Sequence, residues 1–342
     1  MKSKAGDMVG AAGYYGISRN IWRVGVLVFF AFLAVCGLFL SLTQGTMNIS
    51  IIDIMHILQS PIDSSNSQII WNIRMPRTIV GALVGVNLSL SGAILQAVMR
   101  NPLADPHIIG ISSGAGLAGV AIMILFPSME YLVTPVAFVG AMGAAVCIYI
   151  LAWKNGIKPV RVILAGVAVS AFLSSGISGL LIFYSDRVHG ALMWMVGGLA
   201  ARSWPQVTII WPYAVIGLIL ALLGAQYLNI LQLGDEMASG LGVNVEFIRI
   251  ALTAVAALLA ASAVSVVGLL GFVGLIVPHA ARLLIGSDYR FLLPASALLG
   301  IGVVTLSDTF ARVIFSPIEL PVGIIMAFIG APFFLFLLRR EL

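Results

Sequence analysis

Apolar stretches of about twenty residues recur along the whole chain. As a helix, each is long enough to cross a bilayer core of roughly 30 Å. A soluble fold could not bury them all, because 61% of the residues are hydrophobic and only 9% are charged. The alternation typical of a membrane barrel is absent, so we predict an all-α integral membrane protein. We expect about ten transmembrane helices, at residues 24–43, 76–98, 111–126, 132–153, 161–184, 207–228, 249–267, 269–286, 291–310 and 321–338.

One apolar run is too long for a single crossing. The stretch from Ile250 to Ile285 has no clear polar break, and as one helix it would measure about 54 Å, far more than a bilayer requires. The chain must therefore turn back within it, and glycine and proline provide flexible positions for that turn. The candidates are Gly268, Gly271, Gly274 and Pro278.

The basic residues then give the orientation. With ten crossings and both termini in the cytoplasm, most of them fall inside, as the positive-inside rule requires. Those expected inside are Lys2, Lys4, Arg19, Arg23, Arg100, Lys154, Lys158, Arg161, Arg249, Arg290, Arg339 and Arg340. Those expected outside are Arg74, Arg77, Arg187, Arg202 and Arg312. The net charge of +5 therefore indicates membrane topology and not binding to nucleic acid.

Three connections carry patterns of their own. Residues 47–60 and 186–200 have apolar side chains at helical spacing, which predicts short helices along the outer surface. Residues 229–248 form the longest internal connection after the amino-terminal segment 1–22. A short helix should begin there at Asp235 and end at glycine, because acidic residues favour a helix start and glycine favours its end.

Residues for catalysis are almost absent. No HExxH motif is present, and two cysteines cannot form a closed zinc site. None of the four lysines follows a glycine, which excludes a phosphate-binding P-loop. We therefore expect no enzyme activity, no metal site and no cofactor in this chain. An autonomous channel or ion-coupled transporter is the alternative, and it is disfavoured because few charges lie within the predicted spans.

Several long motifs resemble one family. These are "RMPRTIVGALVGVNLSLSGAILQAVMRNPLADPHIIGISSGAG", "GLLGFVGLIVPHAARLLIGSDYRFLLP", "SDTFARVIF" and "ELPVGIIMAFIGAPFFLFLL". They are similar, in the same order, to segments of the FecCD family, the permease subunits of ABC importers for iron–siderophore complexes, haem and vitamin B12. The resemblance implies a vitamin B12 permease-like fold, with residues 1–342 as a single transmembrane permease domain. The implied partners are membrane lipid, a second and identical permease, two ATPase subunits that bind ATP and magnesium, and an extracytoplasmic binding protein.

The resemblance also assigns roles to residues. Arg74, Arg77 and Arg312 match arginines that dock the binding protein, so we expect them on an exposed outer rim; the alternative is that they anchor helices at lipid headgroups. Asn101 and Leu103 match the cytoplasmic gate, while a second gate stays unassigned. The segment "GDEMASGLGVNVEF" is similar to the loop that couples the permease to the ATPase. Its candidate contact residues are Asp235, Glu236, Ala238, Gly240, Leu241 and Gly242.

The resemblance does not single out one cargo. Iron–siderophore complexes are the commonest cargo of the family, so a metal chelate of that kind is the first expectation, with haem or cobalamin as the alternative. The binding protein, and not this chain, is expected to set the specificity. The resemblance also places the protein in the cytoplasmic (inner) membrane of a prokaryote, where transport proceeds by alternating access.

Overall fold

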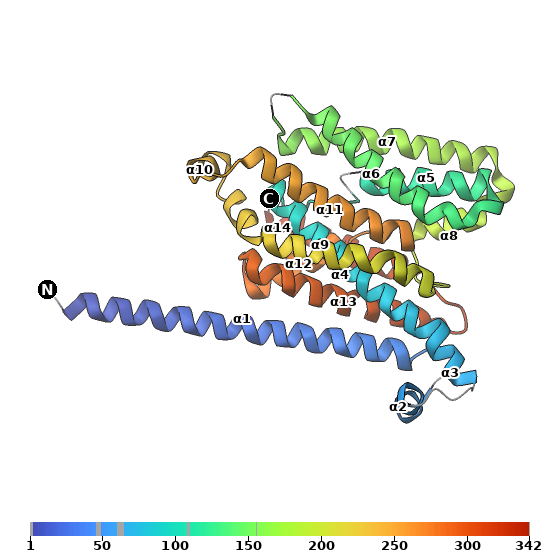
Figure 1. Cartoon of the computed structure of the whole chain (residues 1–342), viewed down its shortest axis with the longest axis horizontal. Helices are drawn as coiled ribbons and strands as arrows, with labels where there is room; N and C mark the ends of the chain where they lie inside the picture. The colour runs from blue at the N-terminus through green and yellow to red at the C-terminus, as the bar shows by residue number, and fades with distance from the viewer. Residues whose placement is uncertain (1–2, 46–48, 60–64, 108–109, 155, 342) are drawn as a thin grey trace.

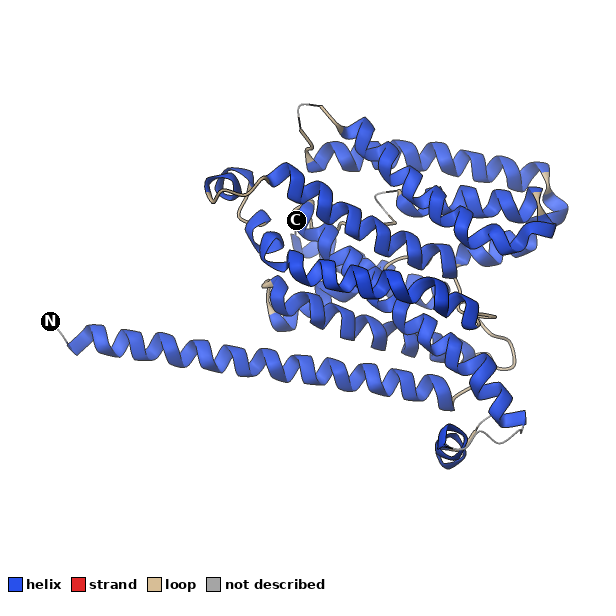
Figure 2. Ribbon diagram, viewed as in Figure 1, coloured by secondary structure: helices blue, strands red, loops and turns tan. Residues whose placement is uncertain are grey.

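The computed structural model describes residues 3–45, 49–59, 65–107, 110–154 and 156–341 (Figure 1). Within these ranges the fold is made of helices, and no β-strand is present (Figure 2). In chain order the helices are α1 (Ser3–Thr43), α2 (Ile51–Gln59), α3 (Ser65–Ile69), η1 (Ile70–Arg74), α4 (Met75–Val98), α5 (Ile111–Leu125), η2 (Pro127–Leu132), α6 (Val133–Ala152), α7 (Pro159–Phe183), η3 (Ser185–Arg187), α8 (Val188–Val196), α9 (Trp204–Leu231), α10 (Asp235–Gly240), α11 (Val245–Val267), α12 (Val273–Ile285), α13 (Tyr289–Val313) and α14 (Val322–Glu341).

The expectation of about ten transmembrane helices is confirmed. Eight stretches of the described residues are long and apolar enough to cross a bilayer, and α5 and α12 are shorter apolar helices. Apart from the first span, which lies within the longer α1, both ends of each predicted span lie within four residues of the corresponding ends of an observed helix. The predicted segment 1–22 is helical from Ser3 and runs without a break into the first span, while Lys2 lies outside the described residues.

Helix α4 forms the centre of the molecule. Most of its residues are buried, and it packs against α9, α11, α12 and α13. Glycine makes this close packing possible, because a methyl group on Gly85 would overlap the carbonyl oxygen of Gly300 in α13, and one on Gly92 would overlap that of Gly274 in α12. Gly114 of α5 meets Gly140 of α6 in the same way. Glycines of the second and third spans therefore allow tight helix packing within the subunit.

The predicted turn in the run from Ile250 to Ile285 is also confirmed. Helix α11 ends at Val267, and Gly268 adopts a positive φ of 82°. The chain then bends through Phe272, which has a left-handed φ of 67°, before α12 begins at Val273. A methyl group on Gly268 would overlap the carbonyl oxygen of Trp194, so glycine is required here by both conformation and space.

The short helices lie at opposite ends of the bundle. Helices α2 and α3 lie at one end, and α10 lies at the other (Figure 1). We call these the α2 end and the α10 end. Helices α2 and α8 confirm the two short helices predicted at 47–60 and 186–200, although residues 47, 48 and 60 lie outside the described ranges. Arg74 and Arg77 lie at the junction of η1 and α4, next to α3, and are therefore at the end opposite the loop that contains α10 (Figure 1).

Candidate functional site

An ion-pair network ties α4 to α13 near the α2 end. Arg77 of α4 donates two hydrogen bonds to the carboxylate of Asp308 in α13, from Nε at 3.0 Å and from one terminal nitrogen at 2.9 Å. Its other terminal nitrogen donates to Glu319 at 2.7 Å. This fork-to-carboxylate geometry is the strongest form of a charge-assisted hydrogen bond. The network therefore fixes the relative position of the two central helices.

The other two candidate docking arginines face inward as well. Arg312 donates to the backbone oxygen of Ser41 at 3.1 Å and lies 3.3 Å from Asp308. Arg74 donates to the carbonyl oxygens of Leu42 and Thr43 at 2.8 and 2.9 Å. Both arginines thus hold the carboxyl end of α1, where the last carbonyl groups of a helix lack internal partners.

The expectation of an exposed arginine rim is wrong for this conformation. Arg74, Arg77 and Arg312 are only 4%, 6% and 2% exposed. The physical reason is that three guanidinium groups, one acidic residue of α13 and the end of α1 satisfy one another inside the protein. A pairing of Asp308 with Arg312 is foreseeable because the two are one helical turn apart. Nothing in the local sequence shows that Arg77 takes the same carboxylate.

The loop after α4 contains two similar turns in succession. The Oδ1 atom of Asn101 accepts the backbone N–H of Leu103 at 2.9 Å, and the Oδ1 atom of Asp105 accepts that of His107 at 2.8 Å. In both turns a proline separates donor and acceptor, and a side chain of this type mimics a backbone turn. This hydrogen bond explains why Asn101 is suited to shape the loop, and Leu103 is half-buried against the core.

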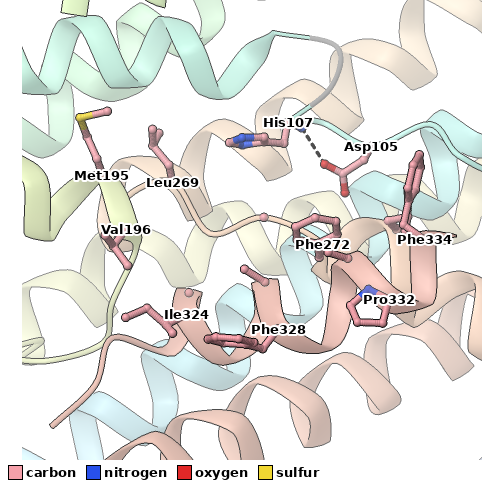
Figure 3. Close-up of a pocket in the computed structure, with 15 residues that line it drawn as sticks. Asp105, His107, Met195, Val196, Leu269, Phe272, Ile324, Phe328, Pro332 and Phe334 are labelled. Atoms are coloured by element: carbon pink, nitrogen blue, oxygen red, sulfur yellow. Dashed lines mark hydrogen bonds between the residues drawn. The ribbon is translucent and has the colours of Figure 1, made fainter. Parts of the chain in front are cut away.

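A large apolar cavity adjoins this loop (Figure 3). Its volume is about 920 Å³, and Asp105 and His107 provide its charged or ionisable groups among the lining residues. Phe272, Phe328 and Phe334 are among the apolar side chains around it. The cavity is therefore large enough for a bulky molecule and offers it mainly apolar contacts.

Asp105 was not singled out by the sequence reasoning. Its Oδ2 atom is buried and has no hydrogen-bond partner among the described residues. Burial raises the pKa of the Asp105 carboxyl above its ordinary value, and nearby His107 opposes this shift. The one available signal in the sequence was the repetition of Asx-Pro four residues apart.

The predicted short helix in the loop 229–248 is confirmed as α10, which begins at Asp235 and ends at Gly240. The Asp235 carboxylate binds Arg249 of α11 at 2.8 Å and lies 3.4 Å from Arg100, in the loop after α4. One acidic group therefore connects α10 to both α11 and the Asn101 turn.

The other predicted contact residues of this loop include one that is buried and four that are exposed to solvent. Ala238 is fully buried and attaches α10 to the protein, whereas Leu241 is 63% exposed. Glu236, Gly240 and Gly242 are also exposed, and Gly242 has a φ of 81° that favours glycine. Met237, which was not among the predicted residues, is 61% exposed beside them. Met237 on α10 and Leu241 directly after it are thus two exposed apolar side chains at this end of the molecule.

Metal-binding groups are scarce in the described part of the chain. No set of three His, Cys, Asp or Glu side chains lies close enough together there to hold a metal ion.

Comparisons with known proteins agree along the chain. The sequence pattern of the FecCD transport family matches residues 32–340. The Fe(3+)-citrate import system permease protein YfmD of Bacillus subtilis is 40% identical over 323 residues, which cover 94% of this chain and 96% of that protein. The cobalamin import system permease protein BtuC of Halobacterium salinarum is 45% identical over 284 residues, covering 82% and 76% of the two chains. A solved structure described as an inward-facing conformation of a metal-chelate type ABC transporter superposes with a TM-score of 0.82 at 29% identity, covering 92% of this chain and 99% of that one.

Proposed function

The chain belongs to the FecCD transport family of ABC importer permeases, and from that premise we propose that it moves an iron–siderophore complex into the cell. The chain is a multi-pass permease subunit of an importer for metal chelates. It is a transport component, and ATP is hydrolysed by separate ATPase subunits. Haem or cobalamin is the alternative cargo, and the cobalamin relative supports it.

The proposed route for coupling starts at α10. An ATPase subunit would contact the exposed side chains of Met237 and Leu241, and its movement would displace the start of the helix at Asp235. The carboxylate of Asp235 bridges Arg249 and Arg100, and Arg100 immediately precedes Asn101. The single observation that carries the proposal is this bridge, because it links the ATPase-facing helix to the proposed gate by one ion-paired step.

The proposed path for cargo is the 920 Å³ cavity. Helix α14 lines it, and Phe328 on that helix is 76% exposed in the single chain. We propose that a second, identical permease covers this side, so that the path lies between the two subunits. The α10 end would face the cytoplasm, with both termini inside, and an extracytoplasmic protein would deliver the chelate at the α2 end.

Docking by Arg74, Arg77 and Arg312 stays a prediction of the family resemblance. Because the three side chains are buried, direct pairing with the binding protein would require the network around Asp308 to open. We propose instead that the arginines shape the docking surface from inside by holding α1, α4 and α13 together. Glu319, which is half-buried, lies where that surface reaches solvent.

The function is tested by purifying the chain in mild detergent and reconstituting it with its co-purifying ATPase in proteoliposomes. Uptake of a radiolabelled ferric hydroxamate or ferric citrate should require ATP and a binding protein. If haem or cobalamin is taken up and neither iron chelate is, the alternative cargo is correct. Transport that survives the loss of every ATPase would refute the importer and support an ion-coupled transporter.

Coupling through α10 is tested at its last residue. Gly240→Pro removes a backbone donor and should abolish uptake while the complex still assembles and hydrolyses ATP. Gly240→Ala is the matched control, since a methyl group there meets no atom within 4 Å. Full uptake by the assembled proline variant would contradict the route through this helix.

A further inference from the structure

A second cavity lies at the α10 end, apart from the apolar one. It has a volume of about 300 Å³ and lies where α4, α9 and α12 end and α13 begins. No acidic residue is among the side chains that line it. The lining residues are Gln96, Arg100, Asn101, Pro102, Gln232, Arg282, Ser287 and Tyr289. In contrast to the apolar cavity, this one is lined by two arginines and by neutral polar side chains.

Arg282 is the central basic group of this cavity, and no carboxylate of the described residues forms an ion pair with it. Its guanidinium donates to the side-chain oxygen of Gln96 at 2.8 Å and to the hydroxyl of Tyr289 at 3.3 Å. The Nε atom is buried and has no hydrogen-bond partner in the described chain. A half-buried guanidinium held only by neutral groups has an unmet demand for an anion.

Two acidic residues lie next to lining residues of this cavity, Asp235 beside Arg100 and Asp288 between Ser287 and Tyr289, and both are bound by other groups. The Asp235 carboxylate pairs with Arg249 at 2.8 Å and with Arg100 at the longer distance of 3.4 Å, so its negative charge is shared between the two arginines. Asp288 accepts from Arg290 at 2.8 Å and from Asn229 at 2.9 Å, and it pairs with Arg23 at 3.5 Å. The positive charge around the cavity therefore exceeds the negative charge.

We propose that this cavity binds a phosphate-type oxyanion. Two guanidinium groups supply paired N–H donors that match phosphate oxygens, and Asn101, Gln232 and Ser287 provide neutral donors. A carboxylate would use only two oxygens, whereas a tetrahedral anion presents oxygens in several directions and fits donors that line several sides. Basic cavities between helix ends on the cytoplasmic side typically bind the headgroups of anionic lipids.

The phosphate group could come from an anionic lipid or from free inorganic phosphate, and the experiment separates the two. The full-length permease is purified in detergent and in nanodiscs with or without phosphatidylglycerol. Retained phospholipid is counted by native mass spectrometry, and protection against thermal unfolding is titrated with inorganic phosphate. Neither readout requires transport or an ATPase, so failure here leaves the proposed function untouched, and failure of the proposed function leaves this result intact.

Arg282→Gln should weaken phosphate or lipid binding by about 10-fold or more, since a hydrogen bond to a charged group contributes about 1.5–3 kcal/mol. Lys158→Gln is the matched control, because it removes one exposed positive charge from the same end without touching the cavity. Ser287→Asp is a second test that leaves Arg282 and its partners intact and places a negative charge at the exposed rim. It should also weaken binding, and this effect should shrink at high salt.

Loss of retained lipid in both cavity variants, but not in the lysine control, identifies a lipid headgroup as the ligand. Protection by phosphate without selective lipid retention identifies the free anion. Equal behaviour of wild type and both cavity variants in every readout would overturn the proposal. A second outcome would also overturn it: Arg282→Gln leaves anion binding unchanged but weakens binding of the ATPase subunit. The cavity would then be the binding site for an acidic side chain of that partner.

Discussion

Replacing Asp308 by asparagine should destabilise the protein strongly, because the change removes the buried carboxylate that pairs with both Arg77 and Arg312. The Asp308 side chain is 2% exposed and the Arg77 side chain 7%. Breaking a buried ion pair by removing one partner costs about 3–5 kcal/mol, since the remaining charge stays buried. The neighbouring pair of Arg77 with Glu319 is half-exposed, and its loss should cost about 1 kcal/mol or less.

These free energies convert to shifts of the unfolding midpoint. An unfolding entropy of about 2.1 cal/mol/K per residue gives about 0.7 kcal/mol/K for a chain of 342 residues. Asp308→Asn should therefore lower the midpoint by about 4–7 °C, and Glu319→Gln by about 1 °C. Both are measured in one detergent by the fluorescence of a thiol-reactive dye that labels the half-buried Cys36 as it becomes accessible, in a Cys147→Ser background because Cys147 is already exposed.

The double variant Asp308→Asn with Arg77→Gln supplies the internal check. Because both changes remove parts of one network, their combined cost should be clearly smaller than the sum of the single costs. Equal midpoint shifts for Asp308→Asn and Glu319→Gln would show that the buried pair stabilises the fold no more than the partly exposed one. A stabilising role of the buried pair would also be refuted if Asp308→Asn left the midpoint unchanged and lowered only the affinity for the binding protein.

Three further predictions concern other parts of the molecule. Gly85→Ala should lower the free energy of unfolding by about 1–3 kcal/mol, because the added methyl group forces α4 away from α13. Gly143→Ala is the control and should be neutral or slightly stabilising, since a methyl group there meets nothing within 4 Å. The two variants are compared by thermal unfolding. Asn101→Ala should increase leak of cargo from proteoliposomes in the absence of ATP by loosening its turn, while Asn101→Asp should preserve the turn and stay tight. Hydrogen bonds from Arg290 and Asn229 lower the pKa of Asp288, so its stabilisation is present above the ordinary value of 3.8 and is lost as pH falls below it. Unfolding midpoints between pH 5 and 3 should therefore fall less in Asp288→Asn than in wild type.

The spans could be predicted from the sequence because hydrophobic length is a local property. The turn within Ile250–Ile285 and the start of α10 at Asp235 follow from local signals too, since glycine and acidic residues act on their own neighbours. These elements are confirmed where the pattern alone placed them.

The arginine network could not be predicted in this way. Arg77 and Asp308 are 231 positions apart, and a hydrophobic pattern does not show which helix faces which. For an arginine at the start of a span, the expected positions of the side chain were therefore the lipid headgroups or an exposed rim. The burial of Asp105 was missed for the same reason, because α12 packs over it from a distant part of the chain.

The central position of α4 has a consequence for the biogenesis of the protein. Asn87 bonds Ser262 at 2.9 Å, Ser91 bonds the carbonyl oxygen of Ala256 at 2.7 Å, and Arg77 bonds Asp308. Each of these partners is synthesised at least 165 residues after the α4 residue that it bonds. A nascent α4 that entered lipid alone would have its polar groups unsatisfied in hydrocarbon. We therefore expect the second span to stay beside the insertion machinery until α11 and α13 have been made.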